Sequence, residues 1–274
     1  MSRIQATFKS LRNKKEKALI PFFTAGDPHP DKTVEIMHTL VAAGADMIEL
    51  GIPFSDPMAD GPVIQRASER ALKNNVGITT TIKLAAEFRK NNKITPLILM
   101  GYANPIEAIG IDNFVLLIKD ADIDGVITVD YPPEESVQFV KKLKENNIDS
   151  IFLISPTTDD KRLKLIINQA TGFLYYVSLK GVTGSANIDI KEVSEKVKNI
   201  KTFTDLPLGV GFGVRDAKTA KEVAEISDAV VIGSRIVQEI ENSNDKDLIN
   251  NIRNLMVEIK SSINKNSETS EWAG

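Results

Sequence analysis

A glutamate at the end of an apolar run is the first feature of this sequence that could do chemistry. Residues 46–50 read DMIEL, which is typical of a short buried strand, and Glu49 is its penultimate residue. A carboxyl group removed from water has a raised pKa, which suits a residue that gives and takes protons near neutral pH. The alternative is a structural glutamate paired with a lysine or an arginine, and sequence position alone favours neither.

Two aspartates follow in the next loop. Residues 51–62 read GIPFSDPMADGP, and Asp60 stands directly before a glycine and a proline. A carboxylate there can cap a helix that has proline at an early position, and it can also serve a site beside Glu49. Asp56, which precedes another proline, is more typical of a turn or of a partner contact.

Glycines stand at the ends of the later apolar segments. The seventh segment ends next to Gly213, and the eighth ends in Gly233 and Ser234, where a helical pattern begins. Glycine lets backbone N–H groups approach phosphate oxygens, and the amino end of a helix favours their negative charge. We therefore expect a phosphate site here, although each glycine taken alone could be a plain turn.

The elements that must position these residues are short apolar runs that alternate with longer amphipathic stretches. We expect strands at 18–23, 46–50, 96–100, 125–129, 150–154, 173–178, 206–212 and 229–233. Helical patterns occupy 30–44, 78–92, 132–147, 159–170, 189–200, 216–226 and, in pieces, 234–263. Continuous apolar runs of this kind are typical of strands that are buried on both faces.

This order predicts an α/β protein with a single (β/α)8 barrel of the TIM type and extra helices, over residues 1–264. A doubly wound open sheet is the alternative, but eight units fit the barrel better, and no GxGxxG follows the first strand. Active sites of such barrels lie at the carboxyl ends of the strands, where Glu49 would point into the barrel mouth. The polar residues 265–274 are expected to form a frayed tail.

Composition argues against several classes of function. The 274 residues carry a formal net charge of −3, so we expect neither a nucleic-acid partner nor a membrane partner. There is no cysteine and there are only two histidines, so we expect no disulfide and no metal site. No apolar run approaches the roughly 18 residues of a membrane span. The amino-terminal residues lack the pattern of a secretory signal, and we expect a cytoplasmic protein.

Several motifs together resemble the tryptophan synthase alpha subunit family, in order from about residue 3 to about residue 260. They are PFFTAGDP (21–28), ELGIPFSDPMADGPVIQRA (49–67), MGYANPI (100–106), YYVSLKGVTG (175–184), GVGFGV (209–214) and VIGS (231–234). The block at 49–67 is the most specific. The resemblance implies a lyase of tryptophan biosynthesis that cleaves indole-3-glycerol phosphate to indole and glyceraldehyde 3-phosphate in a retro-aldol reaction.

The resemblance also implies a role for each site residue. Glu49 would be the general acid and base, and Asp60 would accept a hydrogen bond from the indole N–H. The substrate would contact Phe22, Ile64, Met100, Tyr102, Ile127, Ile154, Tyr175, Thr183 and Phe212. The phosphate would lie on Gly184, Gly213, Gly233 and Ser234. Ordinary core packing is the alternative for each apolar member of this set.

Partners and cofactors follow from the same resemblance. It implies an alpha2beta2 tetramer in which indole passes to the beta subunit, and loops with Pro53, Asp56 and Asn104 resemble the surface that contacts that subunit. The chain itself would carry no cofactor, because pyridoxal phosphate belongs to the beta subunit. Leu179 departs from the arginine of many relatives, and the adjacent Lys180 could replace that charge. Another phosphate-sugar barrel enzyme and a non-catalytic regulatory subunit are the alternatives.

Overall fold

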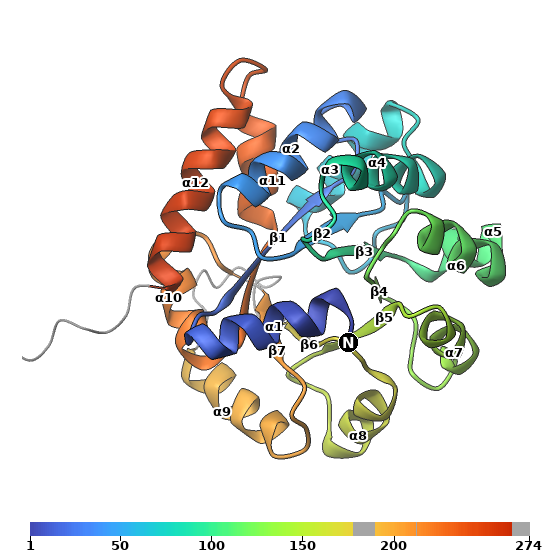
Figure 1. Cartoon of the computed structure of the whole chain (residues 1–274), viewed down its shortest axis with the longest axis vertical. Helices are drawn as coiled ribbons and strands as arrows, with labels where there is room; N and C mark the ends of the chain where they lie inside the picture. Colours follow the sequence, from blue (N-terminus) through green and yellow to red (C-terminus); the bar gives the residue numbers. More distant parts are fainter. Residues whose placement is uncertain (178–189, 212, 265–274) are drawn as a thin grey trace, which may run out of the picture.

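Eight parallel strands close into a barrel and follow one another around it in chain order (Figure 1). The computed structural model describes residues 1–177, 190–211 and 213–264. The strands are β1 Ala18–Thr24, β2 Ile48–Gly51, β3 Leu97–Gly101, β4 Gly125–Thr128, β5 Asp149–Ile154, β6 Leu174–Val177, β7 Leu208–Gly211 and β8 Ala229–Ile232. The closed barrel confirms the predicted fold class and excludes the open doubly wound sheet.

Helices surround the barrel. They are α1 Arg3–Lys14, α2 Pro30–Ala42, α3 Pro62–Lys73, α4 Ile78–Asn91, α5 Ala103–Ile109, α6 Ile111–Asp120, α7 Val137–Glu145, α8 Asp160–Gln169, α9 Ile190–Lys201, α10 Ala217–Ile226, α11 Ser234–Asn242 and α12 Leu248–Ile263. Most coincide with the helical patterns in the sequence. Helix α1 and the pair α5 and α6 were not predicted, and of α3 only the start at Pro62 was. None of the helices described has both the length and the apolar character that crossing a membrane requires.

Local residue types explain where several helices begin. Ser2 caps α1, and Asp159 and Asp216 accept backbone N–H bonds at the starts of α8 and α10. Helices α2 and α3 begin with proline, whose missing N–H costs nothing in a first turn. In α3 the capping residue is Gly61, without a side-chain hydrogen bond. Asp60 therefore does not take the capping role that the sequence allowed.

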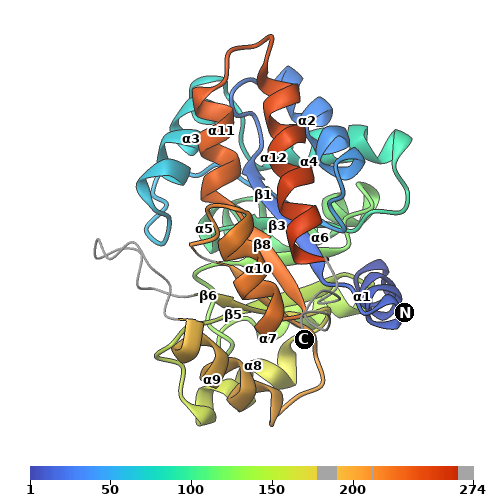
Figure 2. The ribbon, with the colours of Figure 1, turned by 90° about the vertical axis from the view of Figure 1, so that its left-hand side faces the viewer.

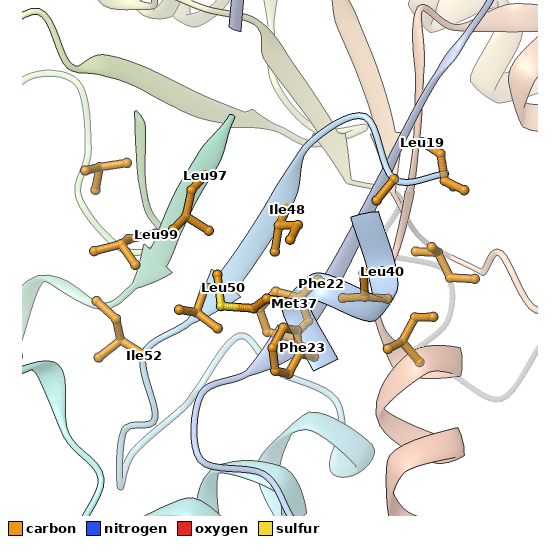
Figure 3. Packing of buried hydrophobic residues seen from close by; sticks show 14 of the residues in the cluster. Leu19, Phe22, Phe23, Met37, Leu40, Ile48, Leu50, Ile52, Leu97 and Leu99 are labelled. Carbon is orange, nitrogen blue, oxygen red and sulfur yellow. The ribbon is translucent and has the colours of Figure 1, made fainter. Parts of the chain in front are cut away.

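Apolar side chains fill both sides of the strand layer. One cluster lies inside the barrel and includes Ile20, Met47 and Ile98. The other lies between the strands and the surrounding helices, and Figure 3 shows Leu50 of β2 near Met37 of α2 within it. Burial on both faces explains why the strands read as continuous apolar runs.

Helix α1 covers the amino end of the barrel. Its buried residues Ile4, Phe8 and Leu11 belong to the same cluster as the barrel interior, and the ring centroids of Phe8 and Phe173 are 5.7 Å apart. Figure 1 shows α1 lying across the barrel. The amino end is thus closed by apolar packing, which leaves the carboxyl end as the open mouth.

Candidate active site

Glu49 lies inside the barrel on β2, beside Phe22 of β1 and Ile98 of β3 in the register. Met47 is in the interior cluster, and side-chain alternation places Glu49 on the same face. The side chain is 0% exposed, and neither carboxyl oxygen has a hydrogen-bond partner within the described part of the chain. No lysine or arginine in the described part of the chain forms an ion pair with Glu49. Burial raises the pKa of Glu49 to about 8.

Asp60 occupies the loop between β2 and α3, and its carboxylate is held by a tyrosine. The Tyr102 hydroxyl donates to Asp60 Oδ2 at 3.0 Å, and the same hydroxyl accepts from the Ala59 backbone N–H at 3.1 Å. Burial raises the pKa of Asp60 to about 6, and the Tyr102 hydrogen bond opposes that rise. The sequence did not indicate this pairing, which joins residues from two different loops.

Tyr175 of β6 is buried inside the same barrel, close enough to Glu49 and Asp60 to interact with both electrostatically. Desolvation raises the pKa of its hydroxyl, and the negative charges of Glu49 and Asp60 raise it further. The hydroxyl therefore stays protonated and can donate a hydrogen bond near neutral pH. Gly211 on the neighbouring strand makes room for it, because a Cβ atom there would overlap the Tyr175 hydroxyl.

The two carboxyl groups differ in protonation near pH 7. With a pKa of about 8 Glu49 holds its proton, whereas Asp60 with a pKa of about 6 is mostly ionised. A pair of titratable groups whose surroundings separate their pKa values is the usual basis for assigning an acid and a base. The arrangement can deliver a proton at Glu49 and stabilise positive charge at Asp60.

A small cavity lies between Asp60 and the apolar residues of the mouth. Its lining is Phe22, Thr24, Gly51, Ile52, Asp60, Ile64, Ser68, Met100, Gly101, Tyr102 and Val129. It brings together four residues that the resemblance assigned to the substrate, namely Phe22, Ile64, Met100 and Tyr102. The cavity volume is only about 10 Å³, close to the least that admits one water, so a bicyclic ring requires these side chains or their loops to shift.

Two glycines, one at the end of β2 and one directly after β8, create the space that Phe22 of the intervening strand β1 occupies. A Cβ on Gly51 would lie 2.8 Å from the Phe22 ring, and one on Gly233 would lie 3.2 Å from it. Thr24, two residues further along β1, was not singled out from the sequence. Its buried hydroxyl has no hydrogen-bond partner within residues 1–177, 190–211 and 213–264. Its position at a strand end, before a glycine-containing loop, was the available signal.

Strand alternation corrects one predicted wall residue. Ile127 lies in the interior cluster, in register with Met100, as a substrate-facing residue should. Ile154 instead belongs to the cluster between barrel and helices. Leu153 packs against the interior cluster and stands beside Tyr175 in the register. The prediction of Ile154 was wrong by one residue, and counting alternation from Ile151 would have found Leu153.

Of the residues expected to hold phosphate, Gly213, Gly233 and Ser234 lie after the carboxyl ends of β7 and β8. Helix α11 begins at Ser234 directly after β8, and its capping residue Gly233 makes no side-chain hydrogen bond. The N–H groups of a first helical turn have no partner within their own helix, so they can face an anion. Gly213 has φ of +72°, a conformation that favours glycine. Thr183, Gly184, Phe212 and the pair Leu179 and Lys180 lie outside the described residues.

An ion-pair network joins the loop after β1 to the helices beside the mouth. Arg70 of α3 donates to Asp27 at 2.7 and 3.0 Å and to Glu241 of α11 at 2.7 Å. Arg66 also donates two hydrogen bonds to Glu241, and these bonds, together with the charges of Arg70 and Arg66, lower the pKa of Glu241 to about 2. The network fixes α3, which follows the Asp60 loop, against the helix that begins at Ser234.

The described residues contain no cluster of three histidine, aspartate or glutamate side chains that could hold a metal ion. The two histidines have other contacts. His29 accepts a bond from the Asp31 backbone at the start of α2, and the His38 ring lies 4.9 Å from Phe88.

Comparison with known proteins gives one consistent match. The family model described as tryptophan synthase alpha chain matches residues 8–267. A tryptophan synthase alpha chain from Janthinobacterium sp. (strain Marseille) is 56% identical over 265 residues, covering 97% of this chain and 100% of the relative. One from Herminiimonas arsenicoxydans is 60% identical over 243 residues, covering 89% and 92%.

Solved structures agree with these relatives. The tryptophan synthase subunit alpha from Legionella pneumophila str. Paris superposes with a TM-score of 0.91 at 42% identity, covering 96% of this chain and 98% of that one. A chain from the aminoacrylate-bound tryptophan synthase of M. tuberculosis gives a TM-score of 0.86 at 31% identity, covering 96% and 100%. The likeness therefore extends over nearly the whole chain in both sequence and fold.

Proposed function

This chain belongs to the tryptophan synthase alpha chain family, and on that premise we propose how its own residues carry out the family's reaction. It is a lyase that cleaves indole-3-glycerol phosphate to indole and glyceraldehyde 3-phosphate. The observation that carries the proposed roles is a fully buried glutamate without a hydrogen-bond partner among the described residues, in the mouth where Asp60 and Tyr175 also lie.

Glu49 starts the reaction as an acid. Its pKa of about 8 keeps it protonated near pH 7, and it gives that proton to C3 of the indole ring. The electron pair that forms the new C3–H bond comes from the ring, which leaves positive charge on the ring nitrogen. Asp60, mostly ionised with a pKa of about 6, accepts the indole N–H hydrogen bond and stabilises that charge.

The carbon–carbon bond breaks in the second step. Glu49, now a carboxylate, takes the proton from the glycerol hydroxyl next to that bond. The oxygen forms a C=O double bond, and the electrons of the breaking bond return to the indole ring and neutralise it. Indole and the aldehyde result, and Glu49 has its proton back, so the cycle is balanced without an oxidant or a reductant.

The remaining residues bind and orient the substrate in this proposal. Tyr175 donates a hydrogen bond to the reacting hydroxyls, supported by the raised pKa that keeps it protonated. Phe22, Ile64, Met100, Tyr102, Ile127 and Phe212 contact the indole ring, and Thr183 also belongs to the substrate site. The phosphate lies on Gly184, Gly213, Gly233 and Ser234, where the start of α11 supports binding by backbone N–H groups.

The family also implies a beta-subunit partner. We propose the alpha2beta2 assembly, with indole passed to the beta subunit, a cytoplasmic location, and no cofactor in this chain. The loop after β2, which carries Asp56, and the start of α5, which carries Asn104, would face the partner. Met58 is 77% exposed in the loop after β2, as an apolar contact residue would be before the partner binds.

The proposed roles are tested with purified protein and indole-3-glycerol phosphate, with and without a beta subunit. Indole release, followed by its absorbance, is the expected result, and Tyr175→Phe should slow it while leaving the fold intact. Ligand binding without indole release in either condition would favour the non-catalytic subunit. Turnover of another phosphate sugar in a substrate panel would favour the other alternative.

A further inference from the structure

Two neighbouring helices, α3 and α11, connect the two ends of the candidate active site. At one end, the Asp60 carbonyl accepts a hydrogen bond of 2.8 Å from the Gln65 side chain, in the first turn of α3. At the other end, α11 begins at Ser234, where the phosphate is proposed to lie. Figure 2 shows α3 beside α11, and the two helices are in contact. The position of α3 against α11 therefore decides how far Asp60 lies from the phosphate.

Helix α11 is anchored to the barrel by its own apolar face. It follows β8 directly, and its residues Ile236, Val237 and Ile240 are each at most 1% exposed. Side chains of this size are held firmly in a close-packed core. The start of α11 should therefore stay in place when contacts between α11 and α3 are lost.

Helix α3 has a much weaker apolar anchor. Its buried residues are Ala67, Ser68 and Ala71, which have small side chains, and its larger residues Val63 and Ile64 are only partly buried. Small side chains interdigitate little with a neighbouring helix and make few contacts with it. Apolar packing alone therefore does little to fix how far α3 slides or turns against α11.

Charged side chains supply the directional contacts of α3. Glu241, about two helical turns beyond Ser234, accepts two hydrogen bonds of 2.7 Å from Arg66 and one of 2.7 Å from Arg70. Arg70 also donates two bonds to Asp27, which is 0% exposed in the loop after β1. Paired contacts between a planar guanidinium and a carboxylate fix geometry as well as adding energy. These bonds therefore set the position of α3 against both α11 and the loop after β1.

We propose that Arg66, Arg70 and Glu241 are positioning residues, which set the distance between Asp60 and the phosphate-binding start of α11. This inference rests on the proposed function and deepens it, because indole-3-glycerol phosphate must reach both places at once. The three side chains act through the position of α3 and need no contact with the substrate. A ligand that reaches only one of the two places should not depend on them.

Glu241→Met tests this dependence, because it removes the contact between α3 and α11 and leaves the pair of Arg70 with Asp27 intact. We expect kcat/KM for indole-3-glycerol phosphate to fall about 10-fold, since a small misplacement of Asp60 is costly. The Kd of glycerol 3-phosphate, measured by calorimetry, should stay unchanged, because this ligand carries only the phosphate half of the substrate. Equal losses for both ligands, or a loss for neither, would overturn the proposal.

Lys260→Met on α12 is the matched control. Lys260 forms an ion pair of 2.6 Å with Asp46, which precedes β2 at the amino end of the barrel. The side chains of Lys260 and Glu241 are both 23% exposed, so the two variants remove ion-paired groups of equal burial. Lys260→Met should leave kcat/KM unchanged. A loss as large as that in Glu241→Met would make general destabilisation the cause and would contradict the proposal.

Amide hydrogen exchange tests the proposal without substrate. The backbone N–H groups of Ala59 and Asp60 donate to the Tyr102 hydroxyl and to the Pro57 carbonyl, so their exchange reports whether the loop keeps its place. Exchange at these two amides should increase in Glu241→Met and not in Lys260→Met. Unchanged exchange in Glu241→Met overturns the proposal even if activity falls. If the parent chain releases no indole, the proposed function fails, and the exchange measurement alone decides this inference.

Discussion

The two ends of the barrel differ in whether a buried carboxyl group has hydrogen-bond partners. At the amino end, Asp124 is buried and accepts hydrogen bonds from Arg3, from Arg89 and from the Leu97 backbone N–H. At the mouth, Glu49 is buried even more completely, but neither of its oxygens has a partner among the described residues. Unpaired buried polar groups cost folding energy, so the difference separates a site built for stability from one built for chemistry.

The largest effect should follow from removing the acid at the mouth. Glu49→Gln keeps the shape of the side chain but cannot transfer a proton, and we expect kcat to fall by about 10²–10⁴. Indole release measured with the beta subunit present checks this. Glu258→Gln, on the exposed face of α12, should retain normal turnover. Near-normal activity in Glu49→Gln would make Glu49 a structural residue.

Breaking the paired cluster at the amino end should cost stability instead. Arg89 is 2% exposed and also donates to the carbonyl groups of Asp122 and Thr95. Arg89→Met leaves these acceptors and part of Asp124 unpaired, and we expect about 3–5 kcal/mol lower free energy of unfolding in urea. Lys90→Met, on the adjacent exposed residue, should change it by less than about 0.5 kcal/mol. Equal effects would remove the contrast between the ends.

Unlike Arg89→Met, Glu49→Gln should increase the free energy of unfolding. The pKa of Glu49 is raised from 4.5 to about 8 on folding, so the native state binds the proton more tightly, and its contribution to stability is lost as pH rises from 4.5 to 8. Glu49→Gln avoids that loss and should be more stable than the parent by about 3 kcal/mol at pH 7. The gain should vanish below pH 4.5. Urea unfolding across that range measures it, and a gain independent of pH would show that burial of the charge is not the cause.

The smallest effect concerns the hydrogen bond between Tyr102 and Asp60. That bond lowers the pKa of Asp60, so Tyr102→Phe should raise it and move the acidic limb of the kcat/KM profile to higher pH. The shift should be up to about one pH unit, since a hydrogen bond to a charged group contributes about 1.5 kcal/mol. Tyr131→Phe, whose hydroxyl bonds Glu107 outside the site, is the control. An unmoved limb would mean that Asp60 does not control it.

The barrel, the position of Glu49 and the strand-end glycines could be predicted from the sequence because they depend on local patterns, whereas the residues assigned to the substrate followed from the resemblance to the family. Glu49 could be placed from the alternation of a short strand, and Gly233 and Ser234 from the junction of a strand with a helix. The bond between Tyr102 and Asp60 could not be found, because it depends on how two loops 42 residues apart in sequence meet. Ile154 was misplaced because strand alternation was not counted there, and one residue reverses the face.

Helix α1 shows a second limit of prediction from the sequence. Ile4, Phe8 and Leu11 have helical spacing, and a pattern search could have found the helix. Its position across the barrel could not be read from that spacing, because it depends on Phe173 and on the ion pairs of Arg3 with Asp122 and Asp124. The bonds that fix α1 therefore belong to tertiary packing rather than to local sequence.

The most direct test of the contrast between the two ends of the barrel is a measurement of the pKa of Glu49. Carbon-13 NMR of protein labelled at glutamate side-chain carboxyl groups, with the Glu49→Gln spectrum used to assign the resonance, follows its titration. If burial at the mouth raises the pKa of Glu49, the midpoint of its titration should lie near 8. A midpoint near the ordinary value of 4.5 would show that Glu49 is ionised at neutral pH and would contradict its role as the acid of the first step.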